Sequence, residues 1–404
     1  TRSASSSRGL GDVYKRQVHV KPVRRLCQQV KAWNPEVLTV VGGHHATVAS
    51  GDFVSPDIDL VVRGEGVEPF RQIMARLERG RGFGAIAGVA VRMGDRLVSG
   101  PEQANGDLDD APMPRRSLTM GYRGEYYSEW LKPLASMRTS KGCPFRCSFC
   151  AQWKTARGRY LRRGVDLVLE ELATIEEECV FFADDESLVD VPRMRTLAER
   201  IRASGISKRL FLYGRSDTVA RHPDLLEAWR EAGLERVFVG LEFFRDGDLD
   251  YVGKGSTVAD NTRAVEVLNG LGIDIYASFI VRPEFDREDF AALRGYIREL
   301  DLDFASFAVL TPLPGTDLFD EFEDRLLIRD TDFFDFIHTV LPTRLPLEEF
   351  FDELMGLYRR AVPPSRQLSL LRKFPMSEWP GLCGRSYRTF KRMKTMAEDY
   401  AGLV

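Results

Sequence analysis

Short apolar runs that alternate with helical patterns from residue 134 to residue 310 restrict the folds open to this chain more than any other feature. Parallel strands need a crossover connection, usually a helix, so this alternation predicts a parallel sheet of the α/β class. Six βα units are fewer than the eight of a closed TIM barrel. We therefore expect an open, partial (β/α)6 barrel over 134–316, with its chemistry at the carboxyl ends of the strands. The predicted strands are 134–140, 179–185, 210–216, 236–242, 274–281 and 303–310.

Three of the six cysteines fall within eight residues, directly after the first predicted strand. The sequence GCPFRCSFC places Cys143, Cys147 and Cys150 in C-x3-C-x2-C spacing. Three thiolates on one tight loop suit three irons of a 4Fe–4S cluster and leave the fourth iron without a protein ligand. An open metal position is typical of a catalytic site. Zinc is the competing interpretation, but a zinc site usually has a fourth Cys or His ligand nearby. A disulfide would leave one of the three thiols of the loop unpaired.

Composition and charge exclude several other classes. Lys and Arg total 57 against 60 Asp and Glu, so the net charge of −3 gives no general attraction for nucleic acid. No apolar run is long enough to predict a transmembrane helix. Neither G-x-S-x-G nor a Walker loop occurs, which disfavours a hydrolase or a kinase. The isolated Cys27, Cys179 and Cys383 are expected to be structural thiols in a reducing cytoplasm.

The segment before the barrel contains half of a second α/β unit. Residues 1–17 are rich in Ser, Gly and Arg without periodicity, and we predict that they are a non-native leader. Residues 18–100 hold two β-branched runs, at 37–43 and 59–66, that alternate with helical patterns. They predict an incomplete doubly wound domain with a parallel sheet, whose first strand would lie upstream.

Two further segments complete the predicted organisation. Residues 101–133 begin with a polar, Pro-rich stretch and are interpreted as a linker. Residues 317–404 follow the last predicted strand and are expected to form a C-terminal helical region. Its part from Arg359 to Lys394 holds ten Lys or Arg and one acid, Glu378. This basic tail is either a solvated helix face that covers the barrel or a patch for peripheral membrane contact.

The cluster loop, with the aromatic Phe149 before its last cysteine, resembles the signature of the radical S-adenosylmethionine (SAM) superfamily over 134–316. The resemblance implies that the open iron chelates the amino and carboxylate groups of SAM. It implies that electron transfer then cleaves SAM to methionine and a 5′-deoxyadenosyl radical. It also implies a six-stranded partial barrel, in agreement with the number of predicted strands.

The resemblance also gives roles to residues at the end of the second predicted strand. Ala183, Asp184 and Asp185 stand in the sequence FFADDES, where the family contacts the SAM amino group, partly through backbone carbonyls. The alternative is that these acids only cap the following helix.

Residues at three later strand ends receive similar roles from the resemblance. Arg215 and Ser216 end the third strand and Glu242 ends the fourth, at positions that commonly touch the SAM carboxylate or ribose. A buried Arg–Glu pair is the alternative. Phe279, on the fifth strand, is expected either to flank the adenine or to pack in the core.

Two glycine-rich loops in 18–100 resemble the cobalamin-binding domain of cobalamin-dependent radical SAM enzymes. The first loop contributes Gly42, Gly43 and His44, and the second is RGEG at 63–66, with Gly64, Glu65 and Gly66. Glycine lets a backbone approach a ligand closely. The usual D-x-H-x-x-G cobalt-ligating motif is absent, so His44 is expected to line the loop. Because only half of the domain is present, cobalamin binding by this chain alone stays open.

Within this branch, CSFCAQWK, DFASFAVLTPLPGT and DFFDFIHTVLPTRLPLEEF resemble the hopanoid carbon-3 methylase group. The resemblance implies a cobalamin-dependent methyltransferase that methylates an unactivated carbon of a large hydrophobic substrate, such as a hopanoid. The alternative is a cyclase of the anaerobic magnesium-protoporphyrin monomethyl ester type, which also carries QWK after the cluster. A non-catalytic iron–sulfur electron carrier is the alternative from another class, but it would normally add a fourth Cys near the loop.

These readings imply particular partners and a location. We expect a small-molecule hydrophobic substrate, a reducing flavodoxin or ferredoxin, and no nucleic acid. The expected location is the cytoplasm, with peripheral contact to the inner membrane if the basic tail binds lipid.

Overall fold

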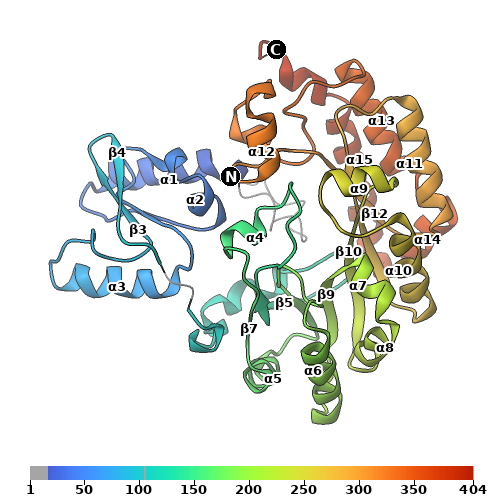
Figure 1. Ribbon diagram of the computed structural model, residues 1–404, viewed down its shortest axis with the longest axis horizontal. Coiled ribbons are helices and arrows are strands. Elements are labelled where there is room, and N and C mark those ends of the chain that lie inside the picture. Colours follow the sequence, from blue (N-terminus) through green and yellow to red (C-terminus); the bar gives the residue numbers. More distant parts are fainter. Residues whose placement is uncertain (1–16, 104–105, 404) are drawn as a thin grey trace.

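The computed structural model describes residues 17–103 and 106–403. Figure 1 shows a small N-terminal sheet with its helices (blue) beside a larger barrel (green to yellow), and C-terminal helices (orange and red) along the barrel. The predicted leader, 1–17, lies outside the described residues except for Gln17. Helix α1, Val20–Trp33, is one of the helices expected within 18–100.

The larger sheet contains six parallel strands in the order β12-β11-β10-β9-β8-β5, which confirms the partial barrel. Each strand runs as an apolar sequence because helices cover one face of the sheet and the other face lines the barrel interior. The bounds are β5, Leu134–Met137; β8, Cys179–Phe182; β9, Arg209–Arg215; β10, Leu234–Glu242; β11, Asp274–Val281; and β12, Ala305–Val309.

Helices between the strands bury one apolar face each against the sheet. Their starts carry the expected caps, since Thr257 and Asp286 each form a capping box at α10 and α11. The glycine after α6, Gly205, has a φ of 72°, as a left-handed helix stop requires. The helices are α5, Val165–Thr174; α6, Val191–Ser204; α7, Ser216–Arg221; α8, Pro223–Glu231; α9, Asp246–Tyr251; α10, Val258–Gly270; and α11, Arg287–Glu299.

The N-terminal sheet is mixed, which corrects the prediction of a parallel sheet. Its order is β1-β2-β3-β4, and only the pair β1–β2 is parallel. The chain reverses at Gly94, whose φ is 62°, and forms a hairpin that sequence reasoning missed. The elements are β1, Val40–Val41; α2, His44–Val48; η3, Ser50–Phe53; β2, Leu60–Val62; α3, Val67–Glu78; β3, Val89–Met93; and β4, Arg96–Ser99.

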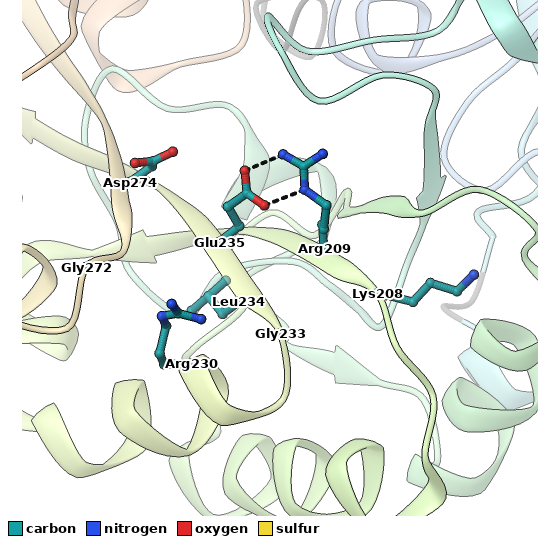
Figure 2. A pocket seen from close by; sticks show the side chains of 8 residues that line it. All are labelled: Lys208, Arg209, Arg230, Gly233, Leu234, Glu235, Gly272 and Asp274. Carbon is teal, nitrogen blue, oxygen red and sulfur yellow. Dashed lines mark hydrogen bonds and ion pairs between the residues drawn. The ribbon is translucent and has the colours of Figure 1, made fainter. Parts of the chain in front are cut away.

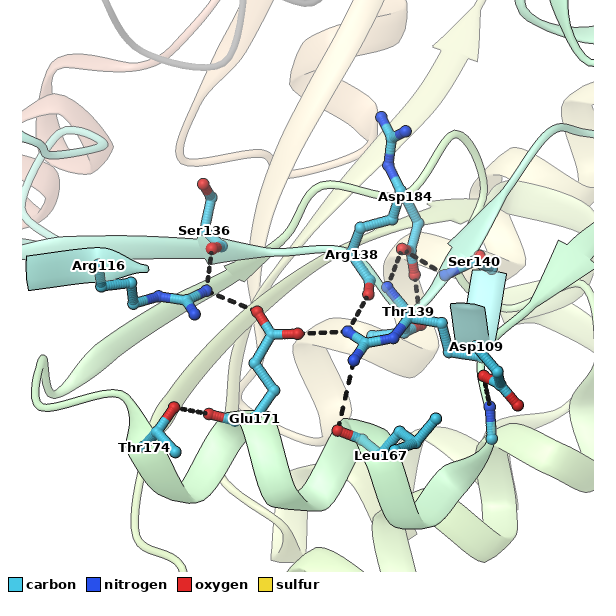
Figure 3. A network of polar contacts seen from close by, with 12 residues as sticks. Asp109, Arg116, Ser136, Arg138, Thr139, Ser140, Leu167, Glu171, Thr174 and Asp184 are labelled. Carbon is cyan, nitrogen blue, oxygen red and sulfur yellow. Dashed lines mark hydrogen bonds and ion pairs between the residues drawn. The ribbon is translucent and has the colours of Figure 1, made fainter. Parts of the chain in front are cut away.

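The segment 101–133 is not a free linker, because its 3-10 helices η4, Leu108–Asp110, and η5, Arg116–Glu125, pack on the barrel. Arg116 donates to buried Glu171 of α5 at 2.7 Å, and Figure 3 shows this carboxylate between two guanidinium groups. Arg123 pairs with Glu177 just before β8. Trp130 packs against the guanidinium of Arg236, 3.6 Å from its ring centroid. The part from Arg116 to Trp130 is therefore a strap that packs on the barrel, and Asp109 of η4 accepts the amide of Gly164 before α5 at 2.7 Å.

The C-terminal region is less helical than expected, since 323–346 forms only short 3-10 turns. This stretch is held by polar contacts instead, including His338 between Asp335 and Asp399. None of the described helices is both long and apolar enough to cross a bilayer. The elements are α12, Asp317–Phe322; η6, Glu323–Arg325; η7, Thr331–Phe333; α13, Leu347–Arg360; α14, Pro364–Arg372; η8, Met376–Glu378; α15, Trp379–Met393; and η9, Met396–Tyr400.

Candidate active site

The cysteine loop lies at the carboxyl end of β5, between the short strands β6, Ser140–Lys141, and β7, Leu161–Arg162, and is followed by α4, Gln152–Thr155. Backbone bonds fix it to two distant segments. The amide of Ser148 donates to the carbonyl of Val252 at 2.9 Å, and the amide of Leu318 donates to the carbonyl of Ser148 at 3.0 Å. The indole of Trp153 donates to the carbonyl of Cys147 at 3.2 Å.

The three thiols lie close enough to influence one another. The pKa of Cys150 is raised, mainly by burial. The negative charges of the Cys147 and Cys143 thiolates raise it further. Burial raises the pKa of Cys143 to about 12. Within 17–103 and 106–403, no three His, Cys, Asp or Glu side chains are grouped as ligands of one metal ion. By its chemistry, a loop of three thiols without a fourth Cys or His beside them suits a cluster in which each thiolate would bind a different iron, whereas zinc usually takes four protein ligands. Loading the loop must release protons.

Two buried cations lie beside Cys147. Arg215 places Nη1 4.0 Å from the Cys147 sulfur, packs on the ring of Phe145 at 3.7 Å, and pairs with Asp217 at 2.9 Å. Lys254 pairs with Glu242, with 2.8 Å between Nζ and Oε1. The charge of the Cys147 thiolate favours the protonated form of Lys254. Positive charge next to thiolates stabilises the ionised form that binds iron.

Asp184 and Asp185 hold the backbone that leads into the cysteine loop. Asp184 is buried and accepts the amides of Thr139 and Ser140 at 2.7 and 2.8 Å, as Figure 3 shows. It also accepts the Thr139 hydroxyl at 2.7 Å. Asp185 accepts the amide of Gly142 at 2.7 Å. These bonds occupy carboxylate oxygens for which the resemblance implies a contact with SAM. The amide of half-buried Ala183 donates to the carbonyl of Met137 at 2.8 Å, and its carbonyl accepts from Arg138 Nε at 3.4 Å.

The other strand-end residues meet at the same end of the barrel. Buried Glu186 accepts the amides of Leu188 and Arg215, and burial raises its pKa to about 7 although Arg215 and Lys254 oppose the shift. The hydroxyl of Ser216 is buried without a hydrogen-bond partner among the described residues. Glu242 ends β10 with a φ of 62°, a left-handed backbone that is costly for a residue other than glycine.

The structure does not place Phe279 at this end of the lumen. Its side chain is fully buried between the sheet and the helices, where it stacks on Phe307 and contacts Tyr296. The prediction that Phe279 flanks an adenine is therefore replaced by its alternative, core packing. Phe149 is half-buried and packs against the apolar cluster that contains Phe243, Leu310 and Leu318.

The loops predicted for cobalamin are exposed and face the barrel. Gly43 and Gly64 have φ values of 105° and 85°, and Gly42 and Gly66 are exposed as well. His44 begins helix α2 and is half-buried. Its neighbour His45 is buried and pairs with Asp52 at 2.6 Å, which gives His45 a structural role.

Contacts join these loops to the cysteine loop. Glu65 pairs with Lys141, two residues before Cys143, while the side-chain amide of Gln103 binds both the amide and the carbonyl of Glu65 at 2.9 Å. Helix α2 contacts α4 directly behind the last cysteine. A Cβ on Gly315 would lie 2.8 Å from Val48 of α2. The side chain of Glu65 is thus committed to the barrel rather than free for a ligand.

Sequence reasoning missed Lys254, Asp217 and Gln103. Lys254 stands in GKGS between two glycines of positive φ, and this glycine pattern was the available signal. Asp217 follows Arg215 by two residues, so the ion pair could have been suspected from the spacing. No local signal marks Gln103, because its partner is 38 residues away.

A cavity of about 400 Å³ lies at the opposite end of the barrel. Figure 2 shows Arg209 and Glu235 joined in an ion pair in the lining of this cavity, with Asp274 at the start of β11. Lys208 donates to the carbonyls of Ile175 and Glu177, so the cations of this cavity already have partners. Active sites of such barrels lie at the carboxyl ends of the strands, and this cavity is therefore not the candidate site.

Comparison with known proteins identifies the class that this fold and loop define. The model of the radical SAM superfamily matches residues 137–297, from the end of β5 through most of α11. The barrel of this chain is thus a radical SAM domain, as the cysteine loop predicts.

Two curated proteins are similar to this chain over most of its length. The chain is 32% identical over 340 residues to hopanoid C-3 methylase of Methylococcus capsulatus, covering 83% of this chain and 65% of the relative. It is 29% identical over 347 residues to anaerobic magnesium-protoporphyrin IX monomethyl ester cyclase of Rubrivivax gelatinosus, covering 83% and 62%. The chain spans slightly less than two thirds of the length of each.

A solved structure supports the fold. The radical SAM methyltransferase TsrM of Kitasatospora setae, solved with tryptophan and a SAM analogue, aligns with a TM-score of 0.65 at 18% identity. The alignment covers 86% of this chain and 75% of that chain, so the likeness includes the N-terminal sheet as well as the barrel.

Proposed function

We propose that this chain is the greater part of a cobalamin-dependent radical SAM methyltransferase that acts on a large hydrophobic substrate, such as a hopanoid. The observation that carries the proposal is the three-cysteine loop at the carboxyl end of a radical SAM barrel, in a chain 32% identical to a hopanoid C-3 methylase. A 4Fe–4S cluster, SAM and cobalamin are the cofactors of this activity. When bound, they supply the electron, the hydrogen-abstracting radical and the methyl group.

The residues of the chain hold and orient these groups. Cys143, Cys147 and Cys150 would bind the cluster, and Asp184 and Asp185 keep the entry to their loop in place. The backbone near Ala183, with Arg215, Ser216 and Glu242, would receive SAM. The loops of Gly42, Gly43 and His44 and of Gly64, Glu65 and Gly66 would lie along the cobalamin, because the Glu65–Lys141 pair seats them beside the cysteines.

The experiment is anaerobic reconstitution of the full chain, followed by assays of iron and sulfide content, of 5′-deoxyadenosine release, and of methyl transfer from methyl-labelled SAM to a hopanoid. Cys147→Ala should lose both the cluster and SAM cleavage. Cys383→Ala is the matched control, because this cysteine is exposed on α15 and should retain both. Cleavage that persists in Cys147→Ala would overturn the assignment.

The second candidate is ring closure of a magnesium-protoporphyrin monomethyl ester, favoured by the 29% identity to that cyclase over 83% of the chain. The same assay separates the candidates, since a cyclase leaves the SAM methyl group untransferred and consumes the porphyrin ester. Both reactions need a reductant, and we propose flavodoxin or ferredoxin in this role.

We also propose that the C-terminal helices α14 and α15 contact an anionic membrane surface, from which a lipid-like substrate would be taken. Arg372, Arg388, Lys391 and Lys394 are exposed and have no acidic partner in the described part of the chain. Leu368, Met376 and Tyr387 are exposed by 48, 77 and 69% in the same segment. Cations beside apolar side chains suit a surface of anionic lipid.

Vesicle co-sedimentation tests this contact with phosphatidylcholine vesicles that either contain or lack phosphatidylglycerol. Binding should require phosphatidylglycerol, and Arg388→Glu with Lys391→Glu should weaken it about tenfold or more. Arg366→Gln, which removes a cation already paired with Asp301, should have little effect. Equal binding to both kinds of vesicle would refute the membrane contact.

A further inference from the structure

The two glycine-rich loops of the N-terminal sheet are bonded to each other through one side chain. Thr47 of α2 donates its hydroxyl to the carbonyl of Gly43 at 2.8 Å. The same hydroxyl oxygen accepts the amide of Gly64 at 2.9 Å. A movement of either loop therefore changes the hydrogen bonds of the other.

Gln103 fixes the backbone of the second loop at the residue that reaches the barrel. Its side-chain oxygen accepts the amide of Glu65, and its side-chain nitrogen donates to the carbonyl of Glu65, both at 2.9 Å. A Cβ on Gly64 would lie 2.7 Å from that oxygen, so glycine leaves the room that Gln103 needs. Because its backbone is held on both sides, Glu65 presents its carboxylate in a defined direction.

Lys141 receives that carboxylate in the segment that leads into the cysteine loop. It pairs with Glu65 from the end of β6, two residues before the first cysteine. The next residue, Gly142, has a φ of 84° and donates its amide to Asp185 at 2.7 Å. A displacement of Lys141 is therefore passed directly to the start of the cysteine loop.

The position of this ion pair suits it to transmit movement more than to add stability. The Lys141 and Glu65 side chains are 12 and 39% exposed, and partly exposed pairs contribute little to the free energy of unfolding. Helix α2 contacts α4 (Figure 1), and Val48 of α2 lies against Gly315, so the sheet stays attached to the barrel without the pair. Loss of the pair would thus release the loops from each other and leave the two parts of the molecule in contact.

We propose that Glu65 and Lys141 are positioning residues that couple the two sets of loops. Loading the cysteine loop orders the glycine-rich loops, and a ligand on the glycine-rich loops orders the cysteine loop, because coupling between two sites is reciprocal. The inference rests on the proposed function, in which a radical made beside one loop and a methyl group held by the other meet at one substrate carbon. Such a reaction needs the loops in a fixed relation, since small displacements of reacting groups are costly in rate.

Amide hydrogen exchange of the full chain, read by mass spectrometry, measures the coupling. In the cluster-free chain, Lys141→Met should raise the exchange rate of residues 63–66 about fivefold or more, because the carboxylate that ties this loop to the barrel loses its partner. Anaerobic reconstitution of the unmodified chain should slow exchange at 63–66 by a similar factor. In Lys141→Met that slowing should disappear, while residues 139–150 remain protected by the cluster.

Two further variants separate positioning from a general loss of structure. The charge-reversed variant, Glu65→Lys with Lys141→Glu, should restore slow exchange at 63–66, since it re-forms the ion pair. Lys21→Met removes another ion pair between the N-terminal segment and the rest of the chain, with Asp330 and Asp332, and should leave exchange at 63–66 unchanged. Urea denaturation should give nearly the same free energy of unfolding for Lys141→Met and the unmodified chain.

The outcomes separate this inference from the proposed function. The coupling is overturned if residues 63–66 exchange equally fast in Lys141→Met and in the unmodified chain, or if reconstitution slows them equally in both. It is also overturned if the charge-reversed variant is as stable as the unmodified chain but exchanges like Lys141→Met, because Lys141 would then act through packing and not through charge. A chain that takes up no iron and cleaves no SAM refutes the proposed function, and the cluster-free comparison then decides the coupling alone.

Discussion

At the scale of single residues, the candidate site concentrates charge that water does not reach. Lys254 and Glu242 form an ion pair whose side chains are only 7 and 11% exposed. Glu242 also holds a left-handed backbone conformation at the end of β10. A Cβ on Gly240 would lie 2.2 Å from the Glu242 carboxylate, so a larger residue there would have to displace this carboxylate from its present position. The Lys254–Glu242 ion pair therefore depends on the left-handed backbone at Glu242 and on the small residue Gly240, as well as on the attraction between the two charges.

Removing one partner of this pair should cost more than removing both. Lys254→Met leaves the Glu242 carboxylate buried without its cation, and we expect the free energy of unfolding to fall by about 3–5 kcal/mol. The double variant Lys254→Met with Glu242→Gln should recover most of that loss, because no uncompensated charge remains. Urea denaturation of the two single variants and the double variant measures the coupling. Additive losses would show that the ion pair contributes nothing beyond its separate residues.

At the scale of elements, His338 fastens the irregular stretch 323–346 to the C-terminal turn η9. Its Nδ1 lies 3.0 Å from Asp335 and its Nε2 lies 3.0 Å from Asp399. The pKa of His338 is raised although burial opposes the shift, because both carboxylates favour the imidazolium. The pKa values of Asp335 and Asp399 are lowered against the effect of burial, with the His338 interaction as the leading cause.

The signs of these shifts predict how stability depends on pH. The stabilisation from His338 is complete below its unfolded pKa of about 6.5 and is lost as the pH rises through its higher folded pKa. The carboxylate contributions hold above about pH 4 and are lost at more acid pH. His338→Gln should therefore reduce unfolding free energy by about 2 kcal/mol near pH 6, and by much less near pH 9. His19→Gln, at an exposed histidine, is the control in urea denaturation at both pH values. An equal loss of stability at both pH values would show that the His338 ion pairs do not fasten this stretch.

Comparison of the strands and loops with the sequence predictions shows which elements a sequence alone can identify. The six barrel strands were found because burial makes each a continuous apolar run, such as Cys179–Phe182. The hairpin strand Arg96–Ser99 was missed because it is largely exposed and its composition resembles a loop. The strap was mistaken for a linker because its arginines find their partners, Glu171 and Glu177, more than 50 residues away. The cysteine loop was recognised because its three cysteines are close together in the sequence, whereas the Lys254–Glu242 pair depends on tertiary structure.

At the scale of the whole molecule, the N-terminal sheet is attached to the barrel at its catalytic end. The Glu65–Lys141 pair and the contact of α2 with α4 lie beside the cysteines, and Lys21 of α1 pairs with Asp330 and Asp332 of the C-terminal region. Figure 1 shows the sheet to one side of the barrel, with α3 below the sheet and α1 above it. One face of α3 therefore stays open to other surfaces.

The exposed face of α3 predicts that the protein associates with itself in solution. Val67, Phe70, Met74 and Leu77 are exposed by 55, 51, 42 and 48%, and their spacing places them on one stripe of α3. A contiguous apolar stripe promotes association. Phe70→Ser with Met74→Ser should reduce the concentration-dependent rise in mass measured by light scattering, while the buried Ile73 keeps the helix on the sheet and limits the loss of stability to about 1 kcal/mol or less. Glu68→Ser, at an exposed position of the same helix outside the stripe, should leave association unchanged. If the double variant associates as strongly as the unmodified chain, the stripe is not the contact surface.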